Sequence, residues 1–335
     1  MNIAVVGAGA WGTGLSIVLG RKGSHRVRLW VLEREVCESI AQTRINEKFL
    51  PGRRIPDSVF TTTDLDTALE GAEIVVSAIP SQHCRRVFEG MRPLIPAQAL
   101  IVSATKGLEE GTLKRMTEVI EEVLKGRNVE FSVGALSGPS FAQEVARGDP
   151  TAITVASRDE TLLRVVQPEF SDPAFRLYTN SDVVGVELGG ALKNTIAIAA
   201  GICDGLGLGH NSAAALITRG LAEMTRLVIA CGGRAETMAG LAGLGDLVLT
   251  CTGGLSRNRS VGVELGRGRK LPEILAGMHG MVAEGIFTTS AAIGLAKARQ
   301  VEMPITEQMH AILHEHKPPQ EAIRELMTRS GKSES

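Results

Sequence analysis

Residues 5–20 read VVGAGAWGTGLSIVLG, an apolar run near the first residue that is interrupted by glycines. Such a run suits either a segment that directs export or a loop that binds a cofactor. An export signal needs a basic start and an unbroken apolar stretch, and a membrane span needs about 20 apolar residues. Here no cation precedes the run, and the first cations, Arg21 and Lys22, follow it. We therefore expect the segment to stay in the folded protein.

The composition favours a soluble protein of the cytoplasm. With 335 residues, 44% of them hydrophobic, the chain can bury a large core and form two domains. A net charge of -1 gives no general attraction for nucleic acid or an acidic membrane. The five cysteines show no Cys-x-x-Cys spacing, which favours free thiols in a reducing compartment. His310 and His314 lack the glutamate of a metalloprotease motif, so we expect a solvated helix face and no metal site.

The glycines of the opening run lie between a predicted strand, residues 2–6, and a predicted helix, residues 13–23. In the motif G-x-G-x-x-G, Gly7 permits a tight turn, Gly9 lets the backbone approach a pyrophosphate, and Gly12 lets the helix pack closely. The free amides of the helix then face the phosphates. This context predicts a dinucleotide site, with a glycine turn that binds nothing as the alternative.

Further apolar runs follow in a strand–helix rhythm. Runs of this length suit strands that are covered on both faces. The expected strands are residues 26–32, 72–79, 99–105, 131–137, 151–157 and 175–179. Ligands of such sheets bind beyond the carboxyl ends of the strands, where Lys106 and Ser140 fall.

After Asp182 the pattern is helical only. We therefore predict an α/β chain in which a Rossmann-like doubly wound sheet is followed by an all-α domain. The dinucleotide-binding domain would span residues 1–180 and the helical substrate-binding domain residues 181–330.

Two polar clusters stand out in the helical half. Residues 185–205 are apolar almost all round, and Lys193 in this run either reaches water at a helix end or has a pKa lowered by desolvation. In the second case it can exchange a proton with a substrate oxygen. Asp246 lies between two apolar runs, and residues 253–258 form a glycine loop that opens a helix at Ser256. Such a loop suits an anion, with a capped helix and a solvated arginine as the alternative.

These segments together resemble the nicotinamide-dependent glycerol-3-phosphate dehydrogenases, which interconvert dihydroxyacetone phosphate and sn-glycerol 3-phosphate. The matching stretches are long and specific, and they lie at residues 7–16, 103–109, 137–148, 187–224, 241–262 and 282–289. The resemblance implies an oxidoreductase that supplies glycerol 3-phosphate for glycerophospholipid synthesis. It also implies that Lys193 donates the proton to the carbonyl oxygen, with Asp246 close by.

The resemblance further implies two sets of binding residues. The substrate residues would be Lys106, Gly138, Ser140, Lys193, Asp246, Ser256, Arg257 and Asn258. The dinucleotide residues would be Gly7, Gly9, Ala10, Trp11, Gly12, Lys106, Ala142, Arg257, Val282 and Glu284, and the spacing of about twenty residues from the glycine motif, independently of the resemblance, adds Glu33 as the acceptor of the ribose hydroxyls.

The choice between NAD and NADP depends on the end of the second strand. Bacterial relatives often place Arg or His there, near the 2′-phosphate of NADP, whereas this chain has Leu32 followed by Glu33 and Arg34. A carboxylate at this point accepts hydrogen bonds from the ribose hydroxyls and repels a phosphate. We therefore expect NADH to be used at least as well as NADPH, with Arg34 as the counter-argument.

Two other classes of protein remain as alternatives. One is a related dehydrogenase of a small carboxylate, such as a β-hydroxyacid or ketopantoate enzyme, which would not need the anion loop from Gly254 to Arg257 beside a second lysine, Lys106. The other is a dinucleotide-binding redox sensor, which would carry a basic DNA-reading element that residues 180–335 do not show. We expect a cytoplasmic homodimer with a phosphorylated three-carbon substrate and no nucleic-acid partner.

Overall fold

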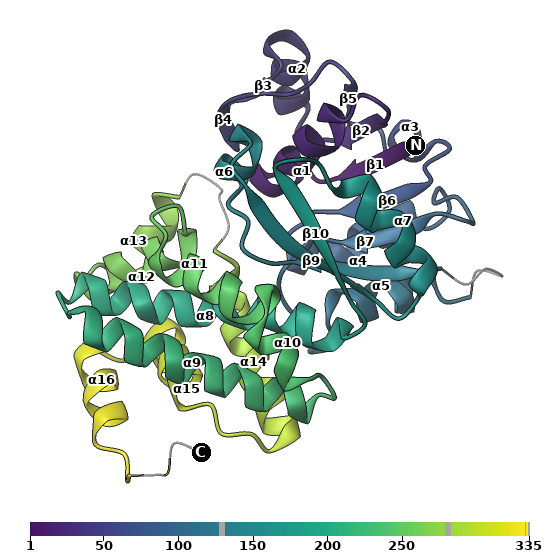
Figure 1. The fold of residues 1–335 in the computed structure, drawn as a ribbon. Coiled ribbons are helices and arrows are strands. Elements are labelled where there is room, and N and C mark those ends of the chain that lie inside the picture. The colour runs from purple at the N-terminus through teal and green to yellow at the C-terminus, as the bar shows by residue number, and fades with distance from the viewer. Residues whose placement is uncertain (127–130, 279–282, 332, 334–335) are drawn as a thin grey trace.

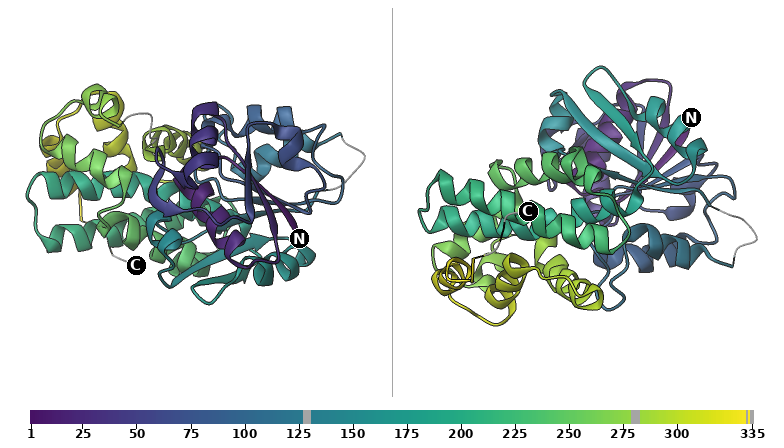
Figure 2. Two further views of the ribbon diagram at one scale, coloured as in Figure 1. Left: turned by 90° about the horizontal axis from the view of Figure 1, so that it is seen from above. Right: turned by 60° about the horizontal axis from the view of Figure 1, so that its bottom comes forward.

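The computed structural model describes residues 1–126, 131–278, 283–331 and 333. It contains a domain of strands and helices up to Asn180 and a helical domain from Val183 onward (Figure 1). The two further views show the two domains lying side by side (Figure 2). The last strand ends at Asn180, and the first helix of the helical domain begins at Val183.

The N-terminal domain is built on one mixed sheet of eight strands in the order β10-β9-β8-β7-β6-β1-β2-β5. All neighbours are parallel except β8 and β9, which pair antiparallel. The strands are β1 (Asn2–Val6), β2 (Arg26–Trp30), β5 (Val59–Thr62), β6 (Ile74–Ser77), β7 (Leu100–Ser103), β8 (Val133–Ser137), β9 (Thr151–Ser157) and β10 (Phe175–Asn180). The predicted strands all form, whereas β5 was not predicted.

Both faces of this sheet are buried, as the apolar runs predict. Successive side chains of a strand point to opposite faces. In β1, Ile3 and Val5 pack into one hydrophobic core, and Ala4 and Val6 pack into the core on the other face with Phe88. The covering elements are α1 (Ala10–Arg21), α2 (Arg34–Thr43), α3 (Leu65–Leu69), η1 (Ser81–His83), α4 (Cys84–Met91), α5 (Met116–Leu124), α6 (Ala142–Arg147) and α7 (Glu160–Phe170).

A small antiparallel hairpin outside the main sheet was also not predicted. It consists of β3 (Ile45–Asn46) and β4 (Leu50–Arg54). The strands are short, and residues 51–54 read Pro-Gly-Arg-Arg, which gives no alternation of apolar and polar residues. A sequence pattern therefore had nothing to detect here.

The C-terminal domain is arranged around the buried helix α8 (Val183–Gly205). The other elements are α9 (His210–Ala230), α10 (Ala235–Ala239), η2 (Leu241–Gly245), α11 (Asp246–Thr252), α12 (Arg257–Gly266), α13 (Leu271–Ala276), α14 (Glu284–Arg299), α15 (Pro304–His314) and α16 (Pro319–Met327). By length and composition α8 resembles a membrane span, but its apolar window is 100% buried within the protein. It is the core helix of this domain.

Glycines bring α12 unusually close to α8. A Cβ atom added to Gly201 would lie 2.0 Å from the carbonyl oxygen of Arg259, and one added to Gly262 would lie 2.0 Å from that of Ile198. Any larger residue at either position would push the helices apart. This packing holds α12 against the C-terminal half of α8.

A buried ion pair joins the two domains. Glu187 of α8 accepts hydrogen bonds from Nη1 of Arg115 at 2.6 Å and from the backbone N of Thr117 at 2.9 Å. Burial raises the pKa of Glu187, and the charge of Arg115 opposes that rise. The contact orients α8 relative to the sheet, because α5 begins at Met116.

Candidate active site

The glycine loop has the geometry that its sequence predicts. Gly7 has φ of +109°, which favours glycine, and a Cβ there would lie 2.7 Å from the carbonyl oxygen of Ala78. A Cβ on Gly12 would lie 1.9 Å from the carbonyl oxygen of Gly7, so helix α1 can approach the loop only without a side chain. A Cβ on Gly9 would meet nothing within 4 Å. Gly9 therefore borders open space at the start of α1.

The start of α1 fits the pyrophosphate of a dinucleotide. Gly9 is the N-cap residue and supplies no side-chain hydrogen bond to the first turn. Free amides at a helix start attract anions, and a backbone without a Cβ allows close approach. In the same turn, Nε1 of Trp11 is buried without a hydrogen-bond partner among the described residues. The loop therefore fits the cofactor that the motif implies.

Asp246 connects lysines from both domains. Its Oδ1 lies 2.5 Å from Nζ of Lys193, and its Oδ2 lies 2.7 Å from Nζ of Lys106. Asp246 is only 1% exposed and Lys193 only 6% exposed, so this cluster is largely removed from water. Lys106 also donates to the carbonyl oxygen of Gly138 at 3.1 Å. Three predicted site residues, far apart in sequence, thus form one hydrogen-bonded cluster.

Lys193 does not lie at a helix end. It is in the middle of α8, because the helix begins ten residues earlier at Val183, and its ammonium also donates to Oγ1 of Thr250 at 2.7 Å. Desolvation is the largest influence and lowers the pKa of Lys193 to about 8, although the charge of Asp246 opposes that shift. The structure therefore excludes the alternative in which this lysine reaches bulk water.

The segment just before Asp246 is a π-helical turn, η2, which leads directly into α11, where Asp246 is the first residue. A π-helical turn is rare and often marks a functional position. It packs closely on α8, since a Cβ on Gly189 would lie 2.6 Å from the carbonyl oxygen of Ala242. Gly189 lies one helical turn before Lys193, so this close approach sets the distance between the lysine and Asp246.

The predicted anion loop opens α12. Ser256 is the N-cap, and its Oγ accepts from the backbone N of Arg259 at 3.2 Å. Arg257 is exposed, and its guanidinium makes no hydrogen bond to another described residue. Asn258 is buried, donates to Oδ1 of Asn194 at 3.0 Å and accepts from the backbone N of Gly285 at 3.0 Å. One N–H of its amide remains available.

Glu284 lies beside this loop at the start of α14. Its carboxylate accepts from Oγ of Ser81 at 2.6 Å and from the backbone N of Ser81 at 3.3 Å. Burial raises the pKa of Glu284, against the hydrogen bonds from Ser81 and the charge of Arg257. The neighbouring predicted residue, Val282, lies outside the described residues.

The loop after β8 carries three further predicted residues, Gly138, Ser140 and Ala142, and Gly138 contacts Lys106. Gly138 has φ of +142°, and its carbonyl oxygen accepts from Oγ of Ser140 at 2.9 Å. Ala142 begins α6 and packs on α1, where a Cβ on Gly14 would lie 3.5 Å from its carbonyl oxygen. Lys106 and Ser140 thus follow the carboxyl ends of β7 and β8, where ligands of such sheets bind.

The end of the second strand differs in detail from the sequence prediction. Strand β2 ends at Trp30, and Glu33 is the N-cap of α2. Arg34 pairs with Glu38 at 2.8 Å. Nζ of Lys48, which sequence reasoning did not select, lies 3.3 Å from Oε1 of Glu33. No local pattern links residues 15 positions apart in this way, so only the hairpin fold identifies Lys48.

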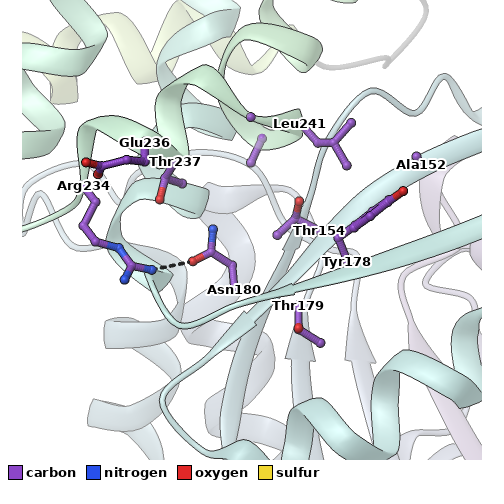
Figure 3. A pocket seen from close by; sticks show the side chains of 11 residues that line it. Ala152, Thr154, Tyr178, Thr179, Asn180, Arg234, Glu236, Thr237 and Leu241 are labelled. Carbon is purple, nitrogen blue, oxygen red and sulfur yellow. Dashed lines mark hydrogen bonds between the residues drawn. The ribbon is translucent and has the colours of Figure 1, made fainter.

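A separate pocket lies between strands β9 and β10 and the segment before Asp246 (Figure 3). Tyr178 and Thr154 line one side, and Arg234 lies on the other, where it donates to Oδ1 of Asn180 at 2.8 Å. None of its lining residues belongs to the predicted site. The charged side chains from both domains meet instead at the Lys193 and Asp246 cluster.

The sheet with its glycine loop, followed by a helical domain that presents a buried lysine, defines the class of nicotinamide-dependent dehydrogenases. Residues 2–163 match the family model for the N-terminus of NAD-dependent glycerol-3-phosphate dehydrogenase, and residues 182–324 match that for its C-terminus. The chain belongs to the NAD(P)-dependent glycerol-3-phosphate dehydrogenase family. It interconverts dihydroxyacetone phosphate and sn-glycerol 3-phosphate, a step of phospholipid metabolism.

Individual relatives agree with this assignment over nearly their whole lengths. The glycerol-3-phosphate dehydrogenase of Koribacter versatilis is 68% identical, over 99% of this chain and 98% of its own. That of Acidobacterium capsulatum is 56% identical, over 99% of both chains. The crystal structure of the Coxiella burnetii enzyme superposes with a TM-score of 0.93 at 43% identity, over 98% of this chain and 99% of that one.

A more distant structure shows a shared fold only. A ketopantoate reductase from Ralstonia eutropha superposes with a TM-score of 0.61 at 16% identity, over 96% of this chain and all of that one. The family match removes the small-carboxylate dehydrogenase and the redox sensor as alternatives for this chain.

Proposed function

We propose that Lys193 is the proton donor when dihydroxyacetone phosphate is reduced. The observation that carries this proposal is the buried cluster in which Asp246 contacts both Lys193 and Lys106. A lysine whose pKa is lowered to about 8 gives up its proton far more readily near neutral pH than an exposed one. Its ammonium also offers positive charge where the substrate oxygen becomes an alkoxide.

Asp246 keeps this lysine usable as an acid. Without a carboxylate, burial alone would favour the neutral amine, which has no proton to donate. The charge of Asp246 opposes desolvation and holds the ammonium of Lys193 in place at 2.5 Å. Lys106 would contact both substrate and cofactor, because it follows β7 and reaches the same carboxylate from the dinucleotide-binding domain.

The substrate phosphate would bind at the start of α12. Ser256, Arg257 and the remaining N–H of Asn258 present a hydroxyl, a guanidinium and an amide at one helix terminus. A guanidinium binds phosphate through paired hydrogen bonds, and the helix start adds free backbone amides. Gly138 and Ser140 would hold the other end of the substrate, next to Lys106.

The dinucleotide would lie along the glycine loop between the domains. Gly7, Gly9, Ala10, Trp11 and Gly12 would hold the pyrophosphate, and Lys106, Ala142, Arg257, Val282 and Glu284 the nicotinamide half. When bound, the reduced cofactor supplies the hydride for the carbonyl carbon. Glu33 would accept from the ribose hydroxyls, which supports use of NADH at least as well as NADPH.

We also propose the division into residues 1–180 for the cofactor and 181–330 for the substrate, and a cytoplasmic homodimer. All five cysteines are free, which suits a reducing compartment. Leu244, Val248 and Leu255 are exposed apolar side chains near the site that a second copy would cover. Sedimentation of the purified enzyme tests the oligomeric state.

Replacement of Lys193 by alanine tests the assignment of the proton donor. We expect turnover of dihydroxyacetone phosphate to fall on the order of a hundredfold or more, the scale for losing general acid catalysis. Nicotinamide fluorescence should show that the variant still binds NADH, which excludes misfolding as the cause. Lys297→Ala, on the exposed end of α14, is the matched control. Near-normal turnover in Lys193→Ala would refute the proposal.

A further inference from the structure

The hairpin of β3 and β4 is attached to the glycine loop by a buried amide. Nδ2 of Asn46 donates to the carbonyl oxygen of Ala8 at 2.8 Å and to Oγ1 of Thr13 at 2.9 Å. Oδ1 of Asn46 accepts from the backbone N of Phe49 at 3.1 Å. Because Asn46 is fully buried, these bonds are costly to break. Residues 46–49 are therefore held against the loop that would bind the dinucleotide.

This attachment brings Lys48 to the end of the second strand. Its Nζ lies 3.3 Å from Oε1 of Glu33 and 4.9 Å from the centre of the Phe49 ring. Strands β1 and β2 are parallel neighbours, with Val6 opposite Trp30, so the glycine loop and Glu33 emerge at the same edge of the sheet. Lys48 and Glu33 thus occupy the corner where the adenosine ribose of a dinucleotide would lie.

The described residues that flank Glu33 are Leu32 and Arg34. Leu32 is 64% exposed but apolar. Arg34 begins α2 and pairs with Glu38 one turn along the same helix at 2.8 Å. Among the described residues, Lys48 is the cation that pairs with Glu33. The side chains of both are partly open to solvent, so a ligand can reach the pair without unfolding the hairpin.

We infer that Lys48 is a cofactor-specificity residue, which neutralises Glu33 when NADH is bound and binds the 2′-phosphate when NADPH is bound. The long, flexible side chain of lysine lets one ammonium serve both partners. The inference rests on the proposed cofactor site at the glycine loop. It explains how the chain can bind NADPH although Leu32 and Glu33, which follow the second strand, offer no positive charge to the 2′-phosphate.

Binding of both cofactors to the apo enzyme tests the role of Lys48. We expect Lys48→Ala to weaken the binding of NADPH about five- to tenfold, the scale of one partly exposed charge-assisted contact. The binding of NADH should weaken less than twofold. Calorimetry with 2′,5′-ADP and 5′-AMP should show the same selective loss without the nicotinamide. Arg34→Ala and the distant Lys297→Ala are the controls, and both should leave the ratio of the two affinities within twofold.

Repeating the measurement in the Glu33→Gln variant distinguishes a direct contact between Lys48 and the 2′-phosphate from an effect of Lys48 on Glu33. In Glu33→Gln, Lys48→Ala should still weaken NADPH selectively, because the 2′-phosphate contact does not need the carboxylate. The inference would be overturned if Lys48→Ala weakened the binding of both cofactors equally or changed neither affinity. It would also be overturned if Arg34→Ala, and not Lys48→Ala, selectively weakened the binding of NADPH. If wild-type enzyme bound neither cofactor at this site, the proposed cofactor site itself would be wrong.

Discussion

Nζ of Lys193, in the middle of α8, lies 2.5 Å from Oδ1 of Asp246, in the first turn of α11, and both side chains are buried. Their separation in sequence is 53 residues. Removing one partner of such a pair leaves a buried charge without compensation. Asp246 therefore influences the pKa of Lys193 and also holds its ammonium in position.

The pH dependence of turnover should follow the titration of Lys193, whose pKa is lowered to about 8. With Lys193 as the proposed proton donor, reduction of dihydroxyacetone phosphate would need the protonated lysine, so its rate should fall as pH rises through about 8. Oxidation of glycerol 3-phosphate needs the neutral amine, so its rate should rise over the same range. Initial rates in both directions between pH 6 and 10 would check these mirror-image profiles.

The variant Asp246→Asn tests whether the carboxylate of Asp246 sets the pKa of Lys193. The charge of Asp246 raises the pKa of Lys193 against desolvation, so its removal should move the inflection to lower pH. An inflection that moved to higher pH, or stayed in place, would contradict the pairing as the controlling contact.

Arg257→Ala should weaken binding of the phosphorylated substrate by roughly 1.5–3 kcal/mol, the scale of a hydrogen bond to a charged group. Unphosphorylated dihydroxyacetone lacks the anion, so its kcat/KM should change much less. The measurement is kcat/KM for both compounds in both proteins. The matched control is Arg259→Ala, two residues after Arg257 in the same helix, because this change removes an ion pair with Asp204 instead. Equal losses for both compounds would show that Arg257 does not recognise the phosphate.

Glu33→Gln should raise kcat/KM for NADPH severalfold relative to NADH, because it removes the carboxylate that repels a 2′-phosphate of about −1.5 to −2 charges. Wild-type enzyme should use NADH at least as well as NADPH. The exposed Glu35 offers a control substitution to glutamine that should leave the ratio unchanged. A wild-type preference for NADPH of tenfold or more that disappears in Arg34→Ala would assign the preference to Arg34 instead.

Glu223 should make stability depend on pH in the helical domain. Its buried carboxylate accepts from the backbone N of Ile305 at 2.6 Å and of Thr306 at 3.2 Å, at the start of α15. Desolvation is the largest influence and raises the pKa of Glu223 to about 7. A pKa raised in the folded state contributes stability below the unfolded value near 4.5 and loses it as pH rises through about 7.

Glu223→Gln mimics the protonated acid and lacks this titration. The free energy of unfolding of wild type relative to the variant should therefore fall, by up to about 3 kcal/mol, between pH 4.5 and 7.5. Thermal or denaturant unfolding at several pH values measures this difference. A difference that is constant with pH would show that Glu223 titrates normally.

The local features of this protein were determined by sequence alone. The glycine motif between strand and helix, the helix start capped by Ser256, and the change to helices after Asp182 each depend on neighbours within one turn or strand. The close approach of Gly12 to the carbonyl oxygen of Gly7 lies within the same short segment, whereas the neighbour of Gly7, Ala78, comes from another strand end. Such features can be predicted because backbone geometry, capping and periodicity act over a few residues.

Tertiary structure alone decided which distant groups meet. The antiparallel direction of β9 follows from its pairing with β8, and an apolar run carries no sign of direction. The distance from Asp246 to Lys193 depends on close packing of η2 on α8, where Ala242 meets Gly189. The contact of Lys48 with Glu33 depends on a hairpin without a sequence pattern. These contacts lie beyond sequence reasoning because they arise from packing between elements, which only the complete fold brings together.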